Sequence, residues 1–231
     1  MSNPSEFRLR LEQQLESWAL PKELAAEVEN RCTFVTYERR ATIFVSGAPA
    51  DLIFLVFKGL VKLYLPLANG SRSFLFIARP GEPLGIIENV ARDGRRHHAL
   101  EAQALTKCIV GLFSREHLVE MLRRLDPEIA IRLLESLNAT WSATFERLAR
   151  FLGLSFRKRL EFVLRDLVTR FGVEEKRGVL IVPELSQEDL AEMIGSSRPM
   201  VSKILADMTE ERFLARGERH LILRSNSAAR R

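Results

Sequence analysis

The sequence predicts an α+β protein with two domains, and three features lead to this fold class. The chain has 231 residues, which exceeds one typical small domain and falls short of three. Short apolar runs separated by turn residues fill roughly residues 33–113, as in a small β-roll or barrel. Helical periodicity then replaces this pattern from Arg115 and leads to a compact unit of two short helices and a hairpin.

The composition excludes several classes of protein. Hydrophobic residues make up 46% of the chain, no run reaches 18 apolar residues, and the N-terminus lacks an apolar signal core. We therefore expect a cytoplasmic protein with no membrane partner. Two cysteines, Cys32 and Cys108, cannot form a disulfide framework or a four-cysteine cluster, and we expect both to be buried and inert. We expect no metal and no cofactor. A net charge of +5 permits nucleic acid binding without requiring it.

The first half of the chain begins with helical spacing over residues 5–30, interrupted by Pro21. Apolar or alternating runs then predict strands at Thr42–Ser46, Leu52–Phe57, Leu60–Leu65 and Ser73–Ala78. The strongest turn signal between them is Asn69-Gly70, because a type I′ turn needs positive φ at both central positions.

Residues 126–152 carry a heptad pattern, in which apolar positions advance by alternating steps of four and three. Its positions are Ala130, Leu134, Leu137, Trp141, Thr144, Leu148 and Phe151. This pattern is typical of a seam between two helices and predicts a dimerisation helix. Packing of the helix on its own β-domain is the alternative, because a helix drifts only ~20° per heptad and about three heptads hardly separate the two. A second helix from about Ser155 to Phe171 is expected to end at Gly172 as its C-terminal cap.

A compact unit follows a short β run at Val179–Val182. Ser186 is a candidate N-cap with Asp189 three residues later, as in a capping box. Gly195 ends this helix in a turn, and a second helix begins at Ser196 or Ser197. Two short helices joined by a glycine turn and followed by a β-hairpin predict a winged helix-turn-helix.

The second helix of such a unit enters the major groove of DNA, led by its N-terminal residues. Arg198 can fork onto guanine O6 and N7 or bind phosphate, and Lys203 lies near the same face. The residues expected to contact DNA are Ser186, Gln187, Ser196, Ser197, Arg198, Met200, Ser202, Lys203 and Arg216. An ordinary helical hairpin with solvated charges is the alternative, but the glycine turn, the apolar face and the hairpin together favour DNA binding.

The chain resembles the Crp/Fnr family of bacterial transcription regulators over nearly its whole length. The resemblance rests on Leu185–Ala191 with Gly195–Arg198, on Asp51–Phe54 with Gly59–Leu63, and on Pro80–Gly85. It implies a cyclic-nucleotide-binding-like β-roll that senses an effector, a long dimerisation helix and a winged helix-turn-helix, over residues 1–125, 126–152 and 153–231. It also implies a homodimer, not an enzyme, that binds a palindromic double-stranded operator and contacts RNA polymerase.

The recognition helix departs from the family pattern, which commonly reads Ser-Arg-Glu-Thr-Val. Pro199 stands in the Glu position and Met200 in the Thr position. Proline cannot accept a hydrogen bond from cytosine N4, so the half-site preference should differ at that base pair. We expect Met200 to pack against the protein rather than to contact a thymine methyl group.

The effector region departs further. Cyclic-AMP-binding members follow the cassette glycine with a glutamate that holds the ribose, whereas Ile86 follows Gly85 here. The family's phosphate-binding Arg-Ser pair aligns roughly with His98-Ala99. The candidate effector residues are Gly85, Ile86, Arg95, Arg96, His98, Ala99 and Thr144. These departures disfavour cyclic AMP and leave an unknown small-molecule effector, or no effector, as the expectation. His97-His98 is expected on a solvated basic loop.

Other functions stay open as alternatives. One is a cyclic-nucleotide-responsive regulator of the same family, and another is haem ligation by His97, His98 or Cys108. A third is a ligand sensor that signals through a protein partner, against which the placement of Arg198 and Lys203 argues. The last is an enzyme that uses the β-roll cavity, but the sequence shows no nucleophile–base pair and no glycine-rich phosphate loop.

Overall fold

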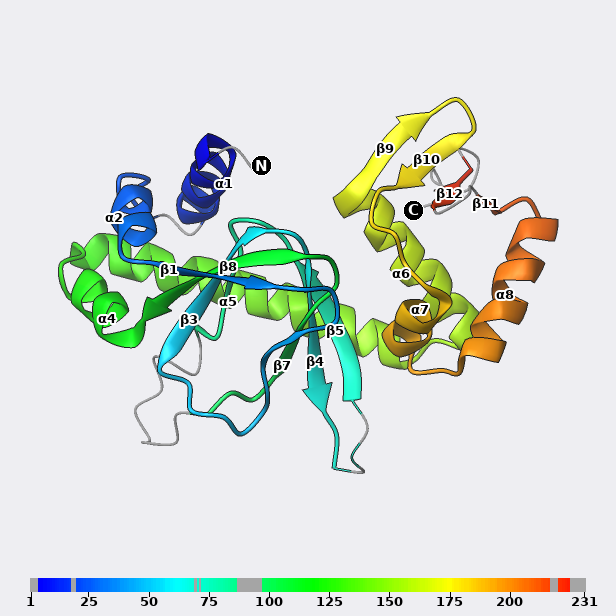
Figure 1. Ribbon diagram of the computed structural model, residues 1–231, viewed down its shortest axis with the longest axis horizontal. Coiled ribbons are helices and arrows are strands. Elements are labelled where there is room, and N and C mark those ends of the chain that lie inside the picture. Colours follow the sequence, from blue (N-terminus) through cyan, green and yellow to red (C-terminus); the bar gives the residue numbers. More distant parts are fainter. Residues whose placement is uncertain are drawn as a thin grey trace. The chain divides into compact units, whose positions relative to one another are not determined.

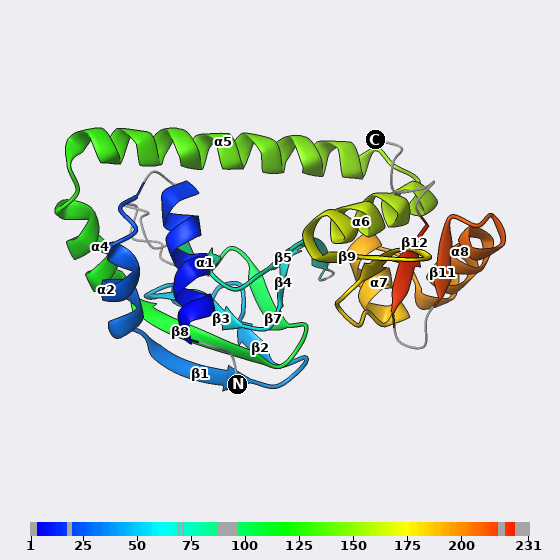
Figure 2. The same ribbon diagram turned by 90° about the horizontal axis from the view of Figure 1, so that it is seen from above.

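A computed structural model describes residues 4–17, 20–68, 70, 72–86, 97–216 and 220–224. The chain forms two compact units, Met1–Phe145 and Glu146–Arg231, so the division falls inside the long helix α5 (Pro127–Leu152). Figure 1 shows the elements of each unit, and Figure 2 shows α5 as one continuous helix. In the described part of the chain, no helix has the length and apolar character needed to cross a membrane.

The first unit is a β-roll flanked by helices. Helices α1 (Pro4–Ser17) and α2 (Leu24–Asn30) lie on either side of Pro21 in sequence, as the interrupted pattern predicts. The roll has two sheets with strand orders β1-β8-β3-β6 and β2-β7-β4-β5. Its strands are β1 (Thr33–Tyr37), β2 (Thr42–Phe44), β3 (Leu52–Lys58), β4 (Val61–Pro66), β5 (Arg72–Ala78), β6 (Pro83–Leu84), β7 (Glu101–Ala104) and β8 (Cys108–Ser114). Helix α4 (Arg115–Arg123) then leads to α5.

Strand β3 is apolar on both faces because each face is covered. Alternate side chains of a strand point to opposite sides of its sheet. Phe54 and Val56 pack into a cluster between the two sheets, which we call the roll interior. Ile53 and Leu55 pack on the other side, in a cluster with residues of α1, α2, α4 and α5, which we call the helix-side cluster. The first unit therefore has two apolar interiors separated by one strand.

The second unit places two short helices on a small sheet. Helix α6 (Phe156–Phe171) leads into an antiparallel sheet of order β11-β12-β10-β9, and α7 (Gln187–Ile194) and α8 (Arg198–Glu210) lie between β10 and β11 in sequence. The strands are β9 (Gly172–Glu175), β10 (Gly178–Ile181), β11 (Leu214–Arg216) and β12 (Leu221–Leu223). The predicted hairpin and the β run before α7 are confirmed.

Gly172 ends α6 as predicted, but not as a left-handed cap. Its backbone is extended, with φ −76° and ψ 141°, and it begins β9, which the sequence did not predict. The glycine is needed for space, because a Cβ atom there would lie 2.4 Å from the carbonyl oxygen of Val168. Strand β9 escaped prediction because all its residues are exposed and lack an alternating apolar pattern.

Candidate nucleic-acid interface

Helix α7 begins with the predicted capping box. Ser186 Oγ accepts a hydrogen bond from the backbone N–H of Asp189 at 3.1 Å and donates one to Asp189 Oδ2 at 2.6 Å. The same carboxylate oxygen accepts from the backbone N–H of Ser186 at 3.0 Å, and Asp189 is buried. Such a cap stabilises a helix by about 1 kcal/mol. The Ser186 hydroxyl proton is thus engaged within the fold, so this residue positions the helix.

The turn between α7 and α8 depends on Gly195. Its backbone is left-handed, with φ 66° and ψ 39°, a conformation that costs other residues roughly 1–2 kcal/mol. Ser197 is the N-cap of α8, since its Oγ accepts from the backbone N–H of Met200 at 3.4 Å. Of the two predicted starting points, Ser197 is therefore the correct one.

Helix α8 has one buried and one exposed face. All its predicted inward residues are buried, namely Val201, Ile204, Leu205 and Met208. Arg198 and Lys203 are exposed and Ser202 is half-buried. Met200 is 42% exposed, so the expectation that it packs against the protein is wrong. Met200 is about 100° around the helix from the buried Val201, which places it at the edge of the buried face, where solvent reaches it.

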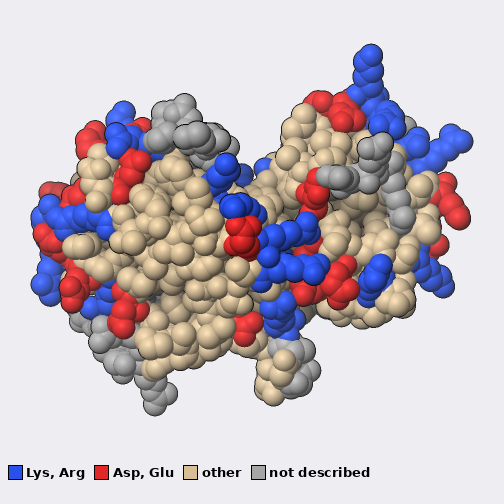
Figure 3. Space-filling model, viewed as in Figure 1, with Lys and Arg blue, Asp and Glu red and all other residues tan. Residues whose placement is uncertain are grey.

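The other residues predicted to contact DNA lie outside this face of α8. Gln187, the first residue of α7, and Ser196 in the turn are half-buried. Arg216 ends β11, and its side chain lies outside the described residues. On the face drawn in Figure 3, Lys and Arg side chains project in the region of α8, with Asp and Glu side chains among them. The exposed face of α8 is therefore a helical surface with positive charge in its first two turns, from Arg198 and Lys203.

Arg159 of α6 is a functional candidate that the sequence reading missed. Its guanidinium donates to the carbonyl oxygens of Leu152 at 3.1 Å, Leu154 at 3.0 Å and Ile194 at 3.3 Å. It also lies 5.2 Å from the ring centre of Phe151. One side chain thus joins the end of α5, the following turn and the end of α7. No sequence pattern reveals such a residue, because its hydrogen-bond partners are backbone carbonyls.

The described residues of the predicted dimer seam are only partly exposed to solvent. Leu134 is 67% exposed and Ala130 is half-buried, whereas Leu133 packs against the helix-side cluster. Phe151 departs from the prediction: it is buried in the second unit, where its ring lies 6.0 Å from that of Phe162. It is covered by its own chain because the last turn of α5 packs on α6. The side chains of Leu137, Trp141, Thr144 and Leu148 lie outside the described residues.

The predicted effector residues that the structure describes lie in two different places. Gly85 and His98 meet, because a Cβ atom on Gly85 would lie 3.1 Å from His98 Cε1. Ile86 instead packs on the helix-side cluster, and Ala99 is exposed. Arg95 and Arg96, like the Thr144 side chain and the Asn69 half of the predicted turn, lie outside the described residues.

His98 is 3% exposed, so the expected solvated loop is wrong for this residue, although His97 is exposed. Its ring stacks on Phe44 with centroids 4.1 Å apart. The reason is non-local: His98 N–H donates to the carbonyl of Ala48 at 2.9 Å, and Gly47 N–H donates to that of His98 at 2.8 Å. This pairing turns the imidazole into the roll interior.

Neither thiol is poised for chemistry. Burial, with a contribution from Glu29, raises the pKa of the half-buried Cys32 to about 12. Burial also raises the pKa of Cys108, whose Sγ donates to the carbonyl oxygen of Leu60 at 3.2 Å. Thiols of this kind stay protonated near neutral pH and react poorly. Within the described ranges, no group of three His, Cys, Asp or Glu side chains could hold a metal ion.

Two family models match the chain. A cyclic nucleotide-binding domain matches residues 34–125, and a Crp-like helix-turn-helix domain matches residues 146–227. Together they cover the β-roll and the unit that carries α7 and α8.

Named relatives and solved structures agree with these models. The chain is 30% identical to a global nitrogen regulator of Synechocystis sp. over 178 residues, covering 76% of this chain and 77% of the relative. It is 28% identical to a CRP-like cAMP-activated global transcriptional regulator of Mycobacterium tuberculosis, covering 85% and 87%. The c-di-GMP-responsive regulator CLP of Xanthomonas campestris shares the fold, with a TM-score of 0.69, 20% identity and 85% and 95% coverage. From its domains and its relatives, the chain belongs to the Crp/Fnr family of transcription regulators.

Proposed function

We propose that the protein is a homodimeric regulator that binds a two-fold-symmetric operator through α8. The observation that carries this proposal is the exposed start of α8, where Arg198, Met200 and Lys203 stand on a helix whose opposite face is buried. The capping box and Gly195 hold this helix at a defined angle to α7. Its expected setting is the cytoplasm, where operator DNA and RNA polymerase are its partners.

The contacts of α8 follow from the chemistry of its exposed residues. Arg198 forks onto guanine O6 and N7, while the thioether of Met200 meets a thymine methyl group. Lys203 adds a phosphate contact, which fixes position without reading sequence. Arg159 is a positioning residue, since it ties the end of α5 to the end of α7. A shift of α5 can therefore be passed to the helices that hold DNA.

Selection from a random pool of double-stranded DNA tests this function. The enriched sites are expected to be inverted repeats, with half-site centres one helical turn apart, about 34 Å. Enrichment of a single asymmetric site, or of none, would contradict a dimeric operator-binding protein. A footprint on the enriched site measures the spacing directly.

Cyclic AMP is not the expected effector. The stacked rings of His98 and Phe44 lie in the roll interior, with His98 beside Gly85, and Ile86 offers no carboxylate to a ribose hydroxyl. A buried phosphodiester needs cationic and hydrogen-bonding partners. Calorimetry should show no binding at micromolar cyclic AMP, with the cAMP-activated M. tuberculosis relative as the positive control. A micromolar dissociation constant would overturn this interpretation.

A further inference from the structure

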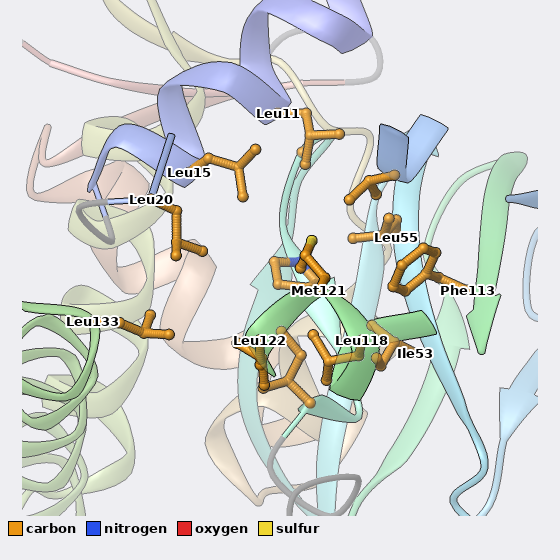
Figure 4. A pocket seen from close by; sticks show the side chains of 14 residues that line it. Leu11, Leu15, Leu20, Ile53, Leu55, Phe113, Leu118, Met121, Leu122 and Leu133 are labelled. Atoms are coloured by element: carbon orange, nitrogen blue, oxygen red, sulfur yellow. The ribbon is translucent and has the colours of Figure 1, made fainter. Parts of the chain in front are cut away.

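The helix-side cluster of the first unit contains an apolar cavity of about 100 Å³ that opens partly to solvent. Figure 4 shows leucines of α1, α4 and α5 and residues of β3 and β8 converging on it. It is separated from the roll interior by β3, because Ile53 and Leu55 line the cavity while Phe54 and Val56 point the other way. None of the described residues that line it has a polar side chain.

The size and chemistry of the cavity select one class of ligand. An engineered apolar cavity of about 150 Å³ stays dry and binds benzene, so a space of two-thirds that volume is too small for an aromatic ring. It can hold the narrow end of an aliphatic chain, and the rest of that chain would extend through the opening of the cavity. Most of the lining side chains are leucine, and Met121 adds a flexible thioether that adapts to shape. We propose that the cavity binds an unbranched aliphatic chain, such as the tail of a fatty acid or alcohol.

The charged groups on the helices that line the cavity indicate that the aliphatic part of the ligand, not its headgroup, supplies the binding affinity. Arg31, the C-cap of α2, pairs with Glu120 of α4 at 2.8 Å, and Arg124, the C-cap of α4, pairs with Glu27 of α2 at 2.5 Å. Both helices also supply lining residues. The two arginines are thus already balanced by two carboxylates. A fatty acid and an alcohol of equal length should therefore bind with similar affinity.

The cavity is placed to act on the regulator. Leu133 lines it from α5, and the next residue, Leu134, is exposed at the predicted dimer seam. Ile86 lines it directly after the family's cassette glycine, Gly85. A bound aliphatic ligand would contact both Leu133 and Ile86. The inferred regulatory effect rests on the proposed function, whereas the binding itself does not.

Calorimetry on the full chain tests the binding with 1-hexanol, 1-octanol, 1-decanol and octanoate, each below its aggregation limit. We expect one binding site per protein molecule and an affinity that rises with the length of the aliphatic ligand to an optimum. The dissociation constants of octanol and octanoate should lie within about threefold of each other. Absence of binding at millimolar ligand would overturn the proposal, since it would mean that the protein's own side chains fill the cavity. A large excess of octanoate affinity over octanol affinity would also overturn it.

Two leucine variants locate the site. Leu122→Ala enlarges the cavity, and because Leu122 is half-buried the variant should fold; its optimum should move to a longer chain. The matched control, Leu112→Ala, removes an equally half-buried leucine beside the roll interior and should leave the optimum unchanged. Equal behaviour of the two variants would place the ligand elsewhere and overturn the proposal.

Operator affinity in the same samples separates the two proposals. Saturating octanol should change it at least fivefold, the lower end of typical allosteric coupling. Operator binding without binding of the aliphatic ligand refutes the cavity as a ligand site and leaves the proposed function intact. Binding of the aliphatic ligand without operator binding supports the cavity and refutes the proposed function. Binding of the aliphatic ligand with unchanged operator affinity refutes the regulatory role.

Discussion

Replacing Arg198 with alanine is expected to abolish specific operator binding while leaving the fold and the dimer intact. Arg198 is exposed at the first position of α8, so its removal leaves no cavity and no buried partner behind. A bidentate contact to guanine contributes about 1–3 kcal/mol of discrimination, and a dimer would lose two of them. The loss of about 2–6 kcal/mol covers most of the margin between specific and non-specific binding.

Gel-shift titrations on operator and on random DNA of equal length measure this effect. The contrasting variant is Lys203→Ala, whose side chain is exposed on the same helix. It should weaken binding to both DNAs alike and make the salt dependence shallower by about two in a dimer. The wild type, with a contact set of about six phosphates, should show a slope near −5. Operator affinity of Arg198→Ala close to that of the wild type would contradict the assignment of α8.

Local signals in the sequence predicted the second unit well. Ser186, Asp189 and Gly195 act within a few residues of one another, so the capping box and the helix end are visible as spacing. The buried face of α8 is visible for the same reason, as helical periodicity. Met200 was misjudged because it stands at the edge of the buried face of α8, where periodicity alone does not determine whether a side chain is covered.

Non-local contacts explain what the sequence did not reveal. His98 is buried because its backbone pairs with that of Ala48, fifty residues earlier in the chain. Arg159 joins three carbonyls that no side-chain pattern marks. The apolar cavity is lined from α1, α2, β3, β8, α4, α5 and the segment around β6, and each contributes residues that look in sequence like ordinary core. Only the packing of these elements leaves space between them.

Leu134→Glu is expected to convert the protein from a dimer to a monomer. Leu134 is 67% exposed on α5 although it stands in the apolar heptad register, which is the condition of a seam residue seen without its partner. Burying one leucine side chain contributes about 1.5–3 kcal/mol, so two of them contribute about 3–6 kcal/mol to a dimer. The substitution also places two carboxylates side by side in the seam. The dissociation constant should rise at least a hundredfold.

Sedimentation at micromolar concentration measures this dissociation, with Ala139→Glu as the control. Ala139 is exposed on α5 outside the heptad register, so the same new charge should leave the dimer intact. Operator affinity should fall with the dimer, because the second α8 then no longer binds as an intramolecular partner at high effective concentration. A wild-type monomer at micromolar concentration would refute the seam itself. If Leu134→Glu stayed dimeric, Leu134 would lie outside the interface, and α5 would pack on its own roll through residues such as Ile129 and Leu133.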